Sequence, residues 1–127
     1  MSEIPENLRY AKSHEWIKVI DTNLVQVGIS DFAQDELGDL VYVDLPKVGR
    51  TVSQAEQCAV VESVKTASDL YSPVSGVVEA INQEVVDDPA LVNTAAYANW
   101  LFAIRANDLA ELDGLLSAQQ YQEFIDA

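Results

Sequence analysis

The sequence predicts a mainly β fold, a sandwich or barrel, with a short helix in its first half and helices at its C-terminal end. Short runs of β-branched and aromatic residues recur at close spacing with turn residues between them, as in antiparallel strands. Only near the C-terminus does the apolar spacing change to a helical period. With 127 residues, 49% of them hydrophobic, the chain can build one core, and we expect a single domain.

The first half of the chain predicts a hairpin and a further strand. Residues 15–20 and 24–29 are apolar and β-branched runs, and the Asp-Thr-Asn segment at 21–23 between them has turn chemistry. Residues 40–45 form the next strand, which ends at Pro46. A strand around 77–81 and a final strand at 100–105 follow later in the chain.

Two further segments connect these strands. Asp31 is expected to begin a short helix, because Asp31 and Gln34 have the spacing of a capping box and Gly38 supplies the stop. The stretch from Asn82 to Ala98 is predicted to be a long loop, since Pro89 interrupts any helix there.

The C-terminal stretch, residues 107–126, is predicted to be a helical cover for the sheet core at about 15–106. Ser117 and Gln120 have capping-box spacing, so we expect a helix over about 118–126. Its apolar residues recur at helical spacing and are expected to bury against the sheet. They are Tyr121, Phe124 and Ile125.

Lys65 is predicted to lie at the tip of a second hairpin, over residues 57–72. The run before it is apolar and β-branched, and a second strand follows the short polar segment around the lysine. Its amine should therefore stand in water. On position alone, such a lysine is most often a solubilising charge.

The residues exclude several classes of function. A net charge of −14 with no basic patch argues against nucleic-acid and anionic-membrane partners. One cysteine and one histidine rule out an internal disulfide framework and zinc sites built from these residues, so we interpret Cys58 as a small core residue and His14 as structural. No nucleotide-binding loop or nucleophile elbow occurs, so the chain is poorly equipped as an enzyme.

No run is long enough to span a membrane, and the polar, acidic start lacks a targeting layout; we expect a cytoplasmic monomer.

The segment around Lys65 is specific. It reads ESVKTASD at residues 62–69 and is followed by PVSG at 73–76. This segment resembles the lipoyl-attachment site of the H proteins of the glycine cleavage system. The resemblance extends over residues 8–126 and includes further blocks in family order: SHEW at 13–16, VGISD at 27–31, LGDLVYVDLP at 37–46 and ELDGLL at 111–116.

The chain departs from the family pattern at a few positions. The family commonly has glycines where this chain has Ala55 and Ala59, and a glycine-containing turn before the last strand. Asn99 is expected to replace that turn glycine, because asparagine tolerates positive φ. Related biotin carriers have methionines beside the lysine, whereas the only methionine here is Met1, and acyltransferase lipoyl domains have Asp-Lys where this chain has Val64 before the lysine.

The resemblance implies a lipoyl/biotinyl-type barrel-sandwich hybrid and a non-enzymatic carrier with lipoic acid in amide linkage to Lys65. It further implies transfer of the aminomethyl group of glycine from a pyridoxal-phosphate glycine decarboxylase to a folate-dependent aminomethyltransferase, with reoxidation by the flavin enzyme dihydrolipoyl dehydrogenase. A lipoate-attaching enzyme would be a fourth partner. An alternative role is a lipoate relay or reservoir that donates lipoyl groups to other lipoyl proteins, since both roles require the same tip.

The resemblance also places arm-docking contacts at Ser13, Glu15 and Asp69. A loaded arm would end in a cation, and a cleft that shields it needs carboxylate or hydroxyl acceptors. Spacing alone favours ordinary solvated charges for Glu15 and Asp69. The sequence therefore leaves two alternatives for these residues, solvated surface charges or contacts for the arm.

Overall fold

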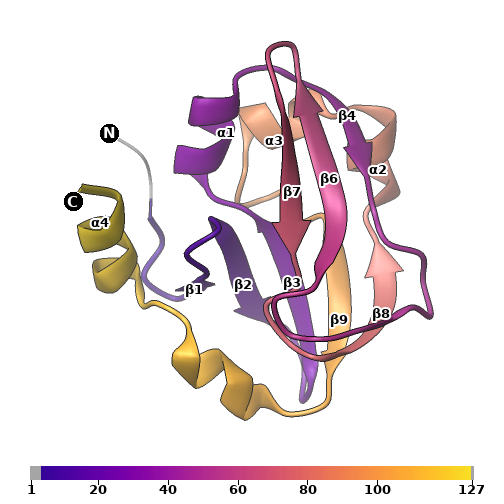
Figure 1. The fold of residues 1–127 in the computed structure, drawn as a ribbon, viewed down its shortest axis with the longest axis vertical. Coiled ribbons are helices and arrows are strands. Elements are labelled where there is room, and N and C mark those ends of the chain that lie inside the picture. The colour runs from indigo at the N-terminus through magenta and orange to yellow at the C-terminus, as the bar shows by residue number, and fades with distance from the viewer. Residues whose placement is uncertain (1–3, 127) are drawn as a thin grey trace.

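The computed structural model describes residues 4–126, which form two antiparallel sheets flanked by short helices (Figure 1). The strands are β1 (Arg9–Tyr10), β2 (Glu15–Val19), β3 (Leu24–Ile29), β4 (Leu40–Asp44), β5 (Thr51–Val52), β6 (Gln57–Ser63), β7 (Ala67–Tyr71), β8 (Gly76–Ile81) and β9 (Phe102–Ala106). The helices are α1 (Asp31–Leu37), α2 (Gln83–Asp87), α3 (Ala90–Thr94), the 3-10 helix η1 (Leu109–Gly114) and α4 (Ala118–Asp126).

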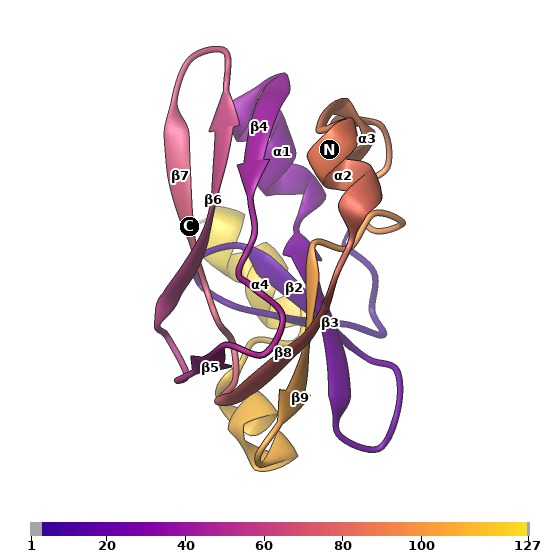
Figure 2. The same cartoon turned by 90° about the vertical axis from the view of Figure 1, so that its right-hand side faces the viewer.

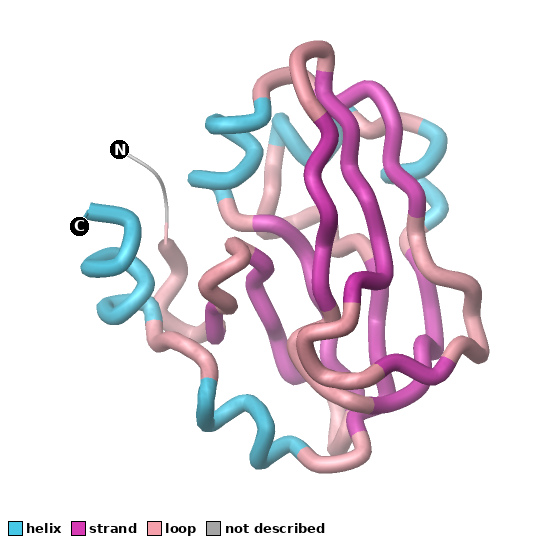
Figure 3. Tube along the Cα trace, viewed as in Figure 1, coloured by secondary structure: helices cyan, strands magenta, loops and turns pink. Residues whose placement is uncertain are grey.

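The larger sheet has the order β1-β2-β3-β9-β8-β5 and the smaller sheet the order β4-β6-β7. Figure 3 shows the β6–β7 hairpin in front of the larger sheet, with its turn projecting beyond the strands of that sheet and the helices at the margins. Neither sheet closes into a barrel in the described part of the chain. The prediction of a mainly β fold is confirmed, and both predicted hairpins are present, β2 with β3 and β6 with β7.

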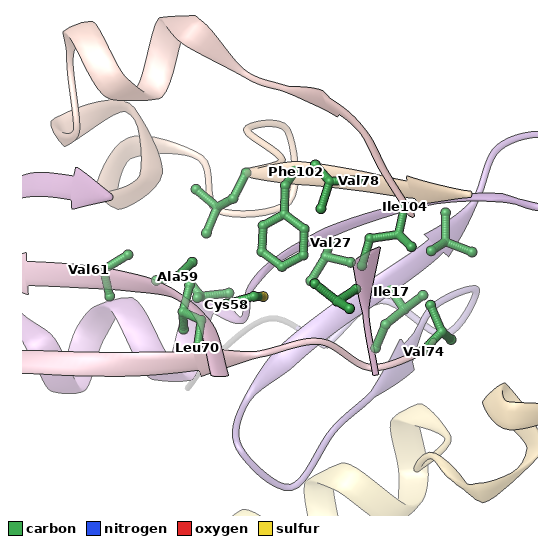
Figure 4. Packing of buried hydrophobic residues seen from close by; sticks show 14 of the residues in the cluster. Ile17, Val27, Cys58, Ala59, Val61, Leu70, Val74, Val78, Phe102 and Ile104 are labelled. Carbon is green, nitrogen blue, oxygen red and sulfur yellow. The ribbon is translucent and has the colours of Figure 1, made fainter. Parts of the chain in front are cut away.

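The core fills the space between the β6–β7 hairpin and the larger sheet (Figure 4). Val61 and Leu70 from the hairpin face Val27, Phe102 and Ile104 from β3 and β9. All five side chains are at most 3% exposed. Burying an aliphatic or aromatic side chain of this size stabilises the fold by about 1.5–3 kcal/mol, so the hairpin is fixed to the sheet by its apolar face.

Cys58 belongs to this core, as predicted. It is 5% exposed, and burial raises the pKa of its thiol to about 12. A thiol with such a pKa is almost entirely protonated at neutral pH and is a poor nucleophile.

Helix α4 packs at the edge of the larger sheet that β1 forms. Tyr121 is fully buried and stacks on Tyr10 of β1, with ring centroids 4.7 Å apart. The predicted cap is present: the Ser117 hydroxyl accepts from the Gln120 amide, and the Gln120 side chain accepts from the Ser117 amide. The predicted burial of the whole apolar stripe is wrong, because Phe124 remains 40% exposed. The two-residue strand β1 is too short to cover more of the helix.

Other sequence predictions need correction. The cap of α1 is Ser30, whose hydroxyl accepts from the Ala33 amide, so Asp31 is the first helical residue. Gly38 ends this helix at φ +83°, as predicted. Asn99 does not have a positive φ; among described residues other than glycine, only His14 and Ala55 do.

The predicted loop at 82–98 contains α2 and α3, with Pro89 between them. Helices of five residues are too short to show a helical period in the sequence. The final strand begins at Phe102, two residues later than expected. The strands β1 and β5, of two residues each, carried no detectable alternation.

We predict that Gly28→Ala destabilises the protein by about 1–3 kcal/mol through overpacking. A Cβ atom at Gly28 would lie 2.5 Å from the buried Trp16 ring. The control is Gly114→Ala, where a Cβ atom would meet nothing within 4 Å. Urea denaturation of both variants checks this, and equal midpoints would contradict it.

Candidate functional site

Lys65 lies in the turn of the β6–β7 hairpin, and its side chain is exposed. The preceding Val64 is 71% exposed. The Ser63 hydroxyl accepts from the amides of Lys65 (3.3 Å) and Thr66 (3.2 Å), and the Ser63 amide donates to the Thr66 carbonyl (2.7 Å). Ser63 is the first residue of the turn and fixes it through these bonds. Serine is common at this position because its hydroxyl can accept from backbone amides two or three residues later.

The lysine turn is also anchored to the body of the protein. The Val64 amide donates to the carbonyl of Asp39, just after α1. Asn93 of α3 donates to the Gly38 carbonyl and accepts from the Leu40 amide, which holds this connecting segment in place. Figures 1 and 2 show α1, α2, α3 and β4 grouped at the end of the molecule from which the hairpin turn projects. The sequence does not indicate the role of Asn93, because five-residue α3 lies in a stretch whose pattern predicts a loop.

The Lys65 side chain is exposed and takes part in no ion pair among the described residues. The two ion pairs found among residues 4–126 are Arg50–Glu56 and Arg105–Glu79, so neither involves this lysine. The Lys65 side chain passes near Gly38 at the end of α1, where an added Cβ atom would lie 3.5 Å from Lys65 Cε. Nothing in these contacts blocks the enlargement of the side chain by an acyl group.

A cleft of about 440 Å³ lies at the far end of β7 from the lysine turn. Its walls come from the β1–β2 turn, the segment before β6, the end of β7 and the segment after η1. The lining includes Ser13, Glu15, Ala55, Tyr71, Pro73 and Leu115. The lining thus combines apolar residues with Ser13 and one acidic residue, Glu15.

Glu15 is the one acidic or basic side chain that is fully buried in the described chain, with no exposed surface. Its carboxyl accepts from the Ser13 hydroxyl and from the Tyr71 amide, the latter at 3.1 Å. Burial raises the pKa of Glu15, and these two hydrogen bonds oppose that shift. Glu15 is therefore not the solvated surface charge that spacing alone favoured.

Asp69 occupies a different environment. It lies on β7 opposite Val60, is exposed, and is not among the residues that line the cleft. The structure therefore brings Ser13 and Glu15 together at the cleft and leaves Asp69 on the strand between the cleft and the lysine. The five residues of β7 span roughly 17 Å, so only a long adduct on Lys65 would reach the cleft.

The family model described as "Glycine cleavage H-protein" matches residues 8–127. The chain belongs to the glycine cleavage H-protein family. It is 57% identical to the glycine cleavage system H protein of Alcanivorax borkumensis, over 100% of this chain and 99% of the relative. It is 54% identical to that of Shewanella loihica, over 99% and 98%.

A solved structure shows the same fold. The crystal structure of a glycine cleavage system H protein from Mycobacterium marinum matches with a TM-score of 0.89 at 41% identity, over 98% of this chain and 100% of that chain. Family membership makes this chain a carrier protein of the glycine cleavage system rather than an enzyme. No described helix combines the length and apolarity needed to cross a bilayer. Within residues 4–126, no group of three or more histidine, cysteine or acidic side chains forms a metal site.

We predict that Glu15→Gln stabilises the protein at neutral pH. Because the folded-state pKa of Glu15 is raised, its stability contribution is fully present below the ordinary value of 4.5 and is lost as pH rises through the folded pKa. Glutamine removes the buried charge and can still accept from Tyr71 and donate to Ser13. The stability gain should therefore grow as pH rises from 4 to 7 in urea denaturation.

The control is Glu79→Gln, which should have the opposite sign. Its hydrogen bond with Arg105 lowers the pKa of Glu79, so its contribution is present above the unfolded value and is lost as pH falls. A Glu15→Gln variant less stable than wild type at neutral pH would contradict the assignment of a desolvated carboxyl.

Proposed function

We propose that Lys65 carries lipoic acid as an amide and that this chain carries the aminomethyl group of glycine from the pyridoxal-phosphate glycine decarboxylase to the folate-dependent aminomethyltransferase, with dihydrolipoyl dehydrogenase restoring the carrier. The observation that carries the proposal is the exposed, unpaired Lys65 amine on a rigid turn within the segment ESVKTASD. When attached, lipoate supplies the dithiolane on which group transfer and oxidation take place.

The chain's own contribution at the tip is presentation. An attaching enzyme and three further partners must each reach one amine or its adduct at a reproducible place. The contacts of Ser63 and Asn93 hold the turn, while the exposed Lys65 side chain keeps its freedom of rotation. Formation of the amide removes the lysine charge from the tip. The arm is then neutral, so its transfer from water into a cleft costs less free energy.

The contribution of the cleft is shelter. An arm lying in the cleft would be shielded from water, which would break down an aminomethyl group on sulfur to formaldehyde and ammonia. The Glu15 carboxyl is buried beside the cleft and hydrogen-bonded to the Ser13 hydroxyl, so a cation bound in the cleft would lie near a carboxylate in a low-dielectric setting. Asp69, exposed on β7, would attract the same cation along the route from the tip.

We further propose that residues 1–127 act as one carrier domain, with the core at about 15–106 and the cover at 107–126, and as a cytoplasmic monomer. The continuous core shared by both sheets supports the single domain. The charge of −14 supports protein partners with basic surfaces rather than nucleic acid or anionic membranes.

Lys65→Arg should fold normally and carry no lipoyl group, because arginine keeps the charge but offers no acylatable amine. Intact mass of the protein from a host with an active attaching enzyme measures this, together with glycine cleavage by the three partner enzymes, which should fall to background. Lys47→Arg is the control and should be modified like the wild type. Lipoyl mass on Lys65→Arg would refute the assignment.

Glu15→Gln should shorten the lifetime of the loaded aminomethyl group by roughly tenfold, the effect of losing one hydrogen bond between charged groups. Formaldehyde release from loaded, lipoylated protein measures the lifetime. Asp69→Asn should change it less, because Asp69 is solvated. Equal lifetimes in wild type and Glu15→Gln would remove the shielding role from the cleft and leave the role of Lys65 untouched.

A further inference from the structure

The turn between β1 and β2 has a histidine where its backbone favours glycine. The His14 amide donates to the Ala11 carbonyl, and the Ala11 amide donates to the Glu15 carbonyl, both at 2.9 Å. His14 itself has φ +78°. This is a hairpin turn followed by one left-handed residue, the position that glycine occupies at least cost. A histidine kept in this conformation needs other contacts to hold it.

The His14 side chain supplies those contacts through the C-terminal helix. Its Nδ1 lies 2.8 Å from the Tyr121 hydroxyl, and its ring packs near Phe32 and Phe124 at centroid distances of 5.3 and 6.1 Å. Burial lowers the pKa of His14, and the Glu36 charge opposes this with a smaller effect. The ring is therefore neutral at neutral pH, with one nitrogen as donor and the other as acceptor.

The Tyr121 hydroxyl connects three elements. It contacts His14 in the β1–β2 turn and also lies 2.6 Å from the Ser30 hydroxyl, the cap of α1. Burial raises the pKa of Tyr121 to about 12, so the hydroxyl keeps its proton and can both donate and accept. Stacking on Tyr10 fixes the ring from the other side. One oxygen atom on α4 thus ties the turn to the start of α1.

The turn that these contacts hold contributes residues to the wall of the cleft. His14 stands between Ser13 and Glu15, which both line the cleft and are hydrogen-bonded to each other. Ala55, the second left-handed residue other than glycine in the described chain, lines the cleft from another segment at φ +70°. Strained residues persist where the surrounding structure holds them, and they gather at functional sites. Here Ala55 lines the cleft itself, and His14 lies between two residues that line it.

We propose that Tyr121 is a positioning residue for the cleft: through His14 it holds Ser13 and Glu15 in the arrangement that receives the cationic end of the arm. The inference rests on the proposed function for the purpose of the cleft, but the positioning itself is a property of the unmodified protein. It gives α4 a role beyond covering apolar surface, and it accounts for a histidine where the backbone favours glycine.

The test compares Tyr121→Phe with Tyr10→Phe in the full, unlipoylated chain. Both variants remove one hydroxyl from the same stacked pair, but the Tyr10 hydroxyl donates to the Pro5 carbonyl and not to the turn. Two NMR readouts report on the cleft: hydrogen exchange of the Tyr71 amide, which donates to Glu15, and titration of the Glu15 carboxyl.

Tyr121→Phe should speed exchange of the Tyr71 amide at least several-fold and move the Glu15 pKa toward its ordinary value, because water enters the loosened cleft. Tyr10→Phe should change neither. If the two variants lose stability alike and neither alters exchange or titration, the contact is structural only and the proposal is wrong.

His14→Gly provides an independent test. It distinguishes an effect of the backbone conformation alone from positioning of the turn by the His14 side chain. Glycine relieves the backbone strain and, if backbone conformation alone matters, leaves Tyr71 exchange and Glu15 titration unchanged. If the side chain positions the turn, both readouts change as in Tyr121→Phe, and the double variant adds little more. An additive double variant would overturn the proposal.

Loaded protein separates this inference from the proposed function. If Glu15→Gln leaves the lifetime of the aminomethyl group unchanged, the shielding role fails while the NMR results on positioning still stand. If Glu15→Gln shortens the lifetime but Tyr121→Phe leaves both the lifetime and the cleft readouts unchanged, the positioning role fails and the shielding role stands.

Discussion

Removing a carboxyl group from water is costly unless hydrogen-bond donors meet it, and the arrangement around Glu15 follows from that constraint. The two donors come from separate parts of the fold, the Ser13 hydroxyl in the β1–β2 turn and the Tyr71 amide at the end of β7. Each must be held in position by its own element. Glu15 thereby joins the larger sheet to the lysine hairpin, and the cleft forms where they meet.

In the proposed function, a single strand, β7, joins the exposed lysine turn to the cleft that would shelter the loaded arm. One end of β7 leads from the exposed turn at Lys65, and the other end reaches the buried carboxyl. The turn is fixed by short-range hydrogen bonds from Ser63. Because the Lys65 side chain is exposed, partners can approach it from several directions. The cleft, in contrast, is lined by segments that lie far apart in the sequence: the β1–β2 turn, the segment before β6, the end of β7 and the segment after η1. The proposed function needs both properties, and the structure has the exposed lysine and the cleft at opposite ends of one hairpin.

The sequence predicted what depends on local pattern. The hairpins, the lysine at a turn and the Ser117 cap of α4 all follow from neighbouring residues. It could not predict what depends on distant contacts: spacing favoured a solvated Glu15, and nothing local indicated that Tyr121 would reach His14 across 107 positions. The alanine at position 55 was noted as a departure from a family glycine, but its left-handed φ, +70°, became visible only in the structure.

The pKa of the Glu15 carboxyl, measured by NMR in lipoylated protein before and after loading with the aminomethyl group, tests the central claim most directly. Burial raises this pKa in the unloaded protein, and a cation held against the carboxylate favours its charged form. The account therefore predicts a fall in the Glu15 pKa on loading, with the solvated Asp69 changing less. A Glu15 pKa unchanged by loading would show that the cation does not enter the cleft and would contradict the account.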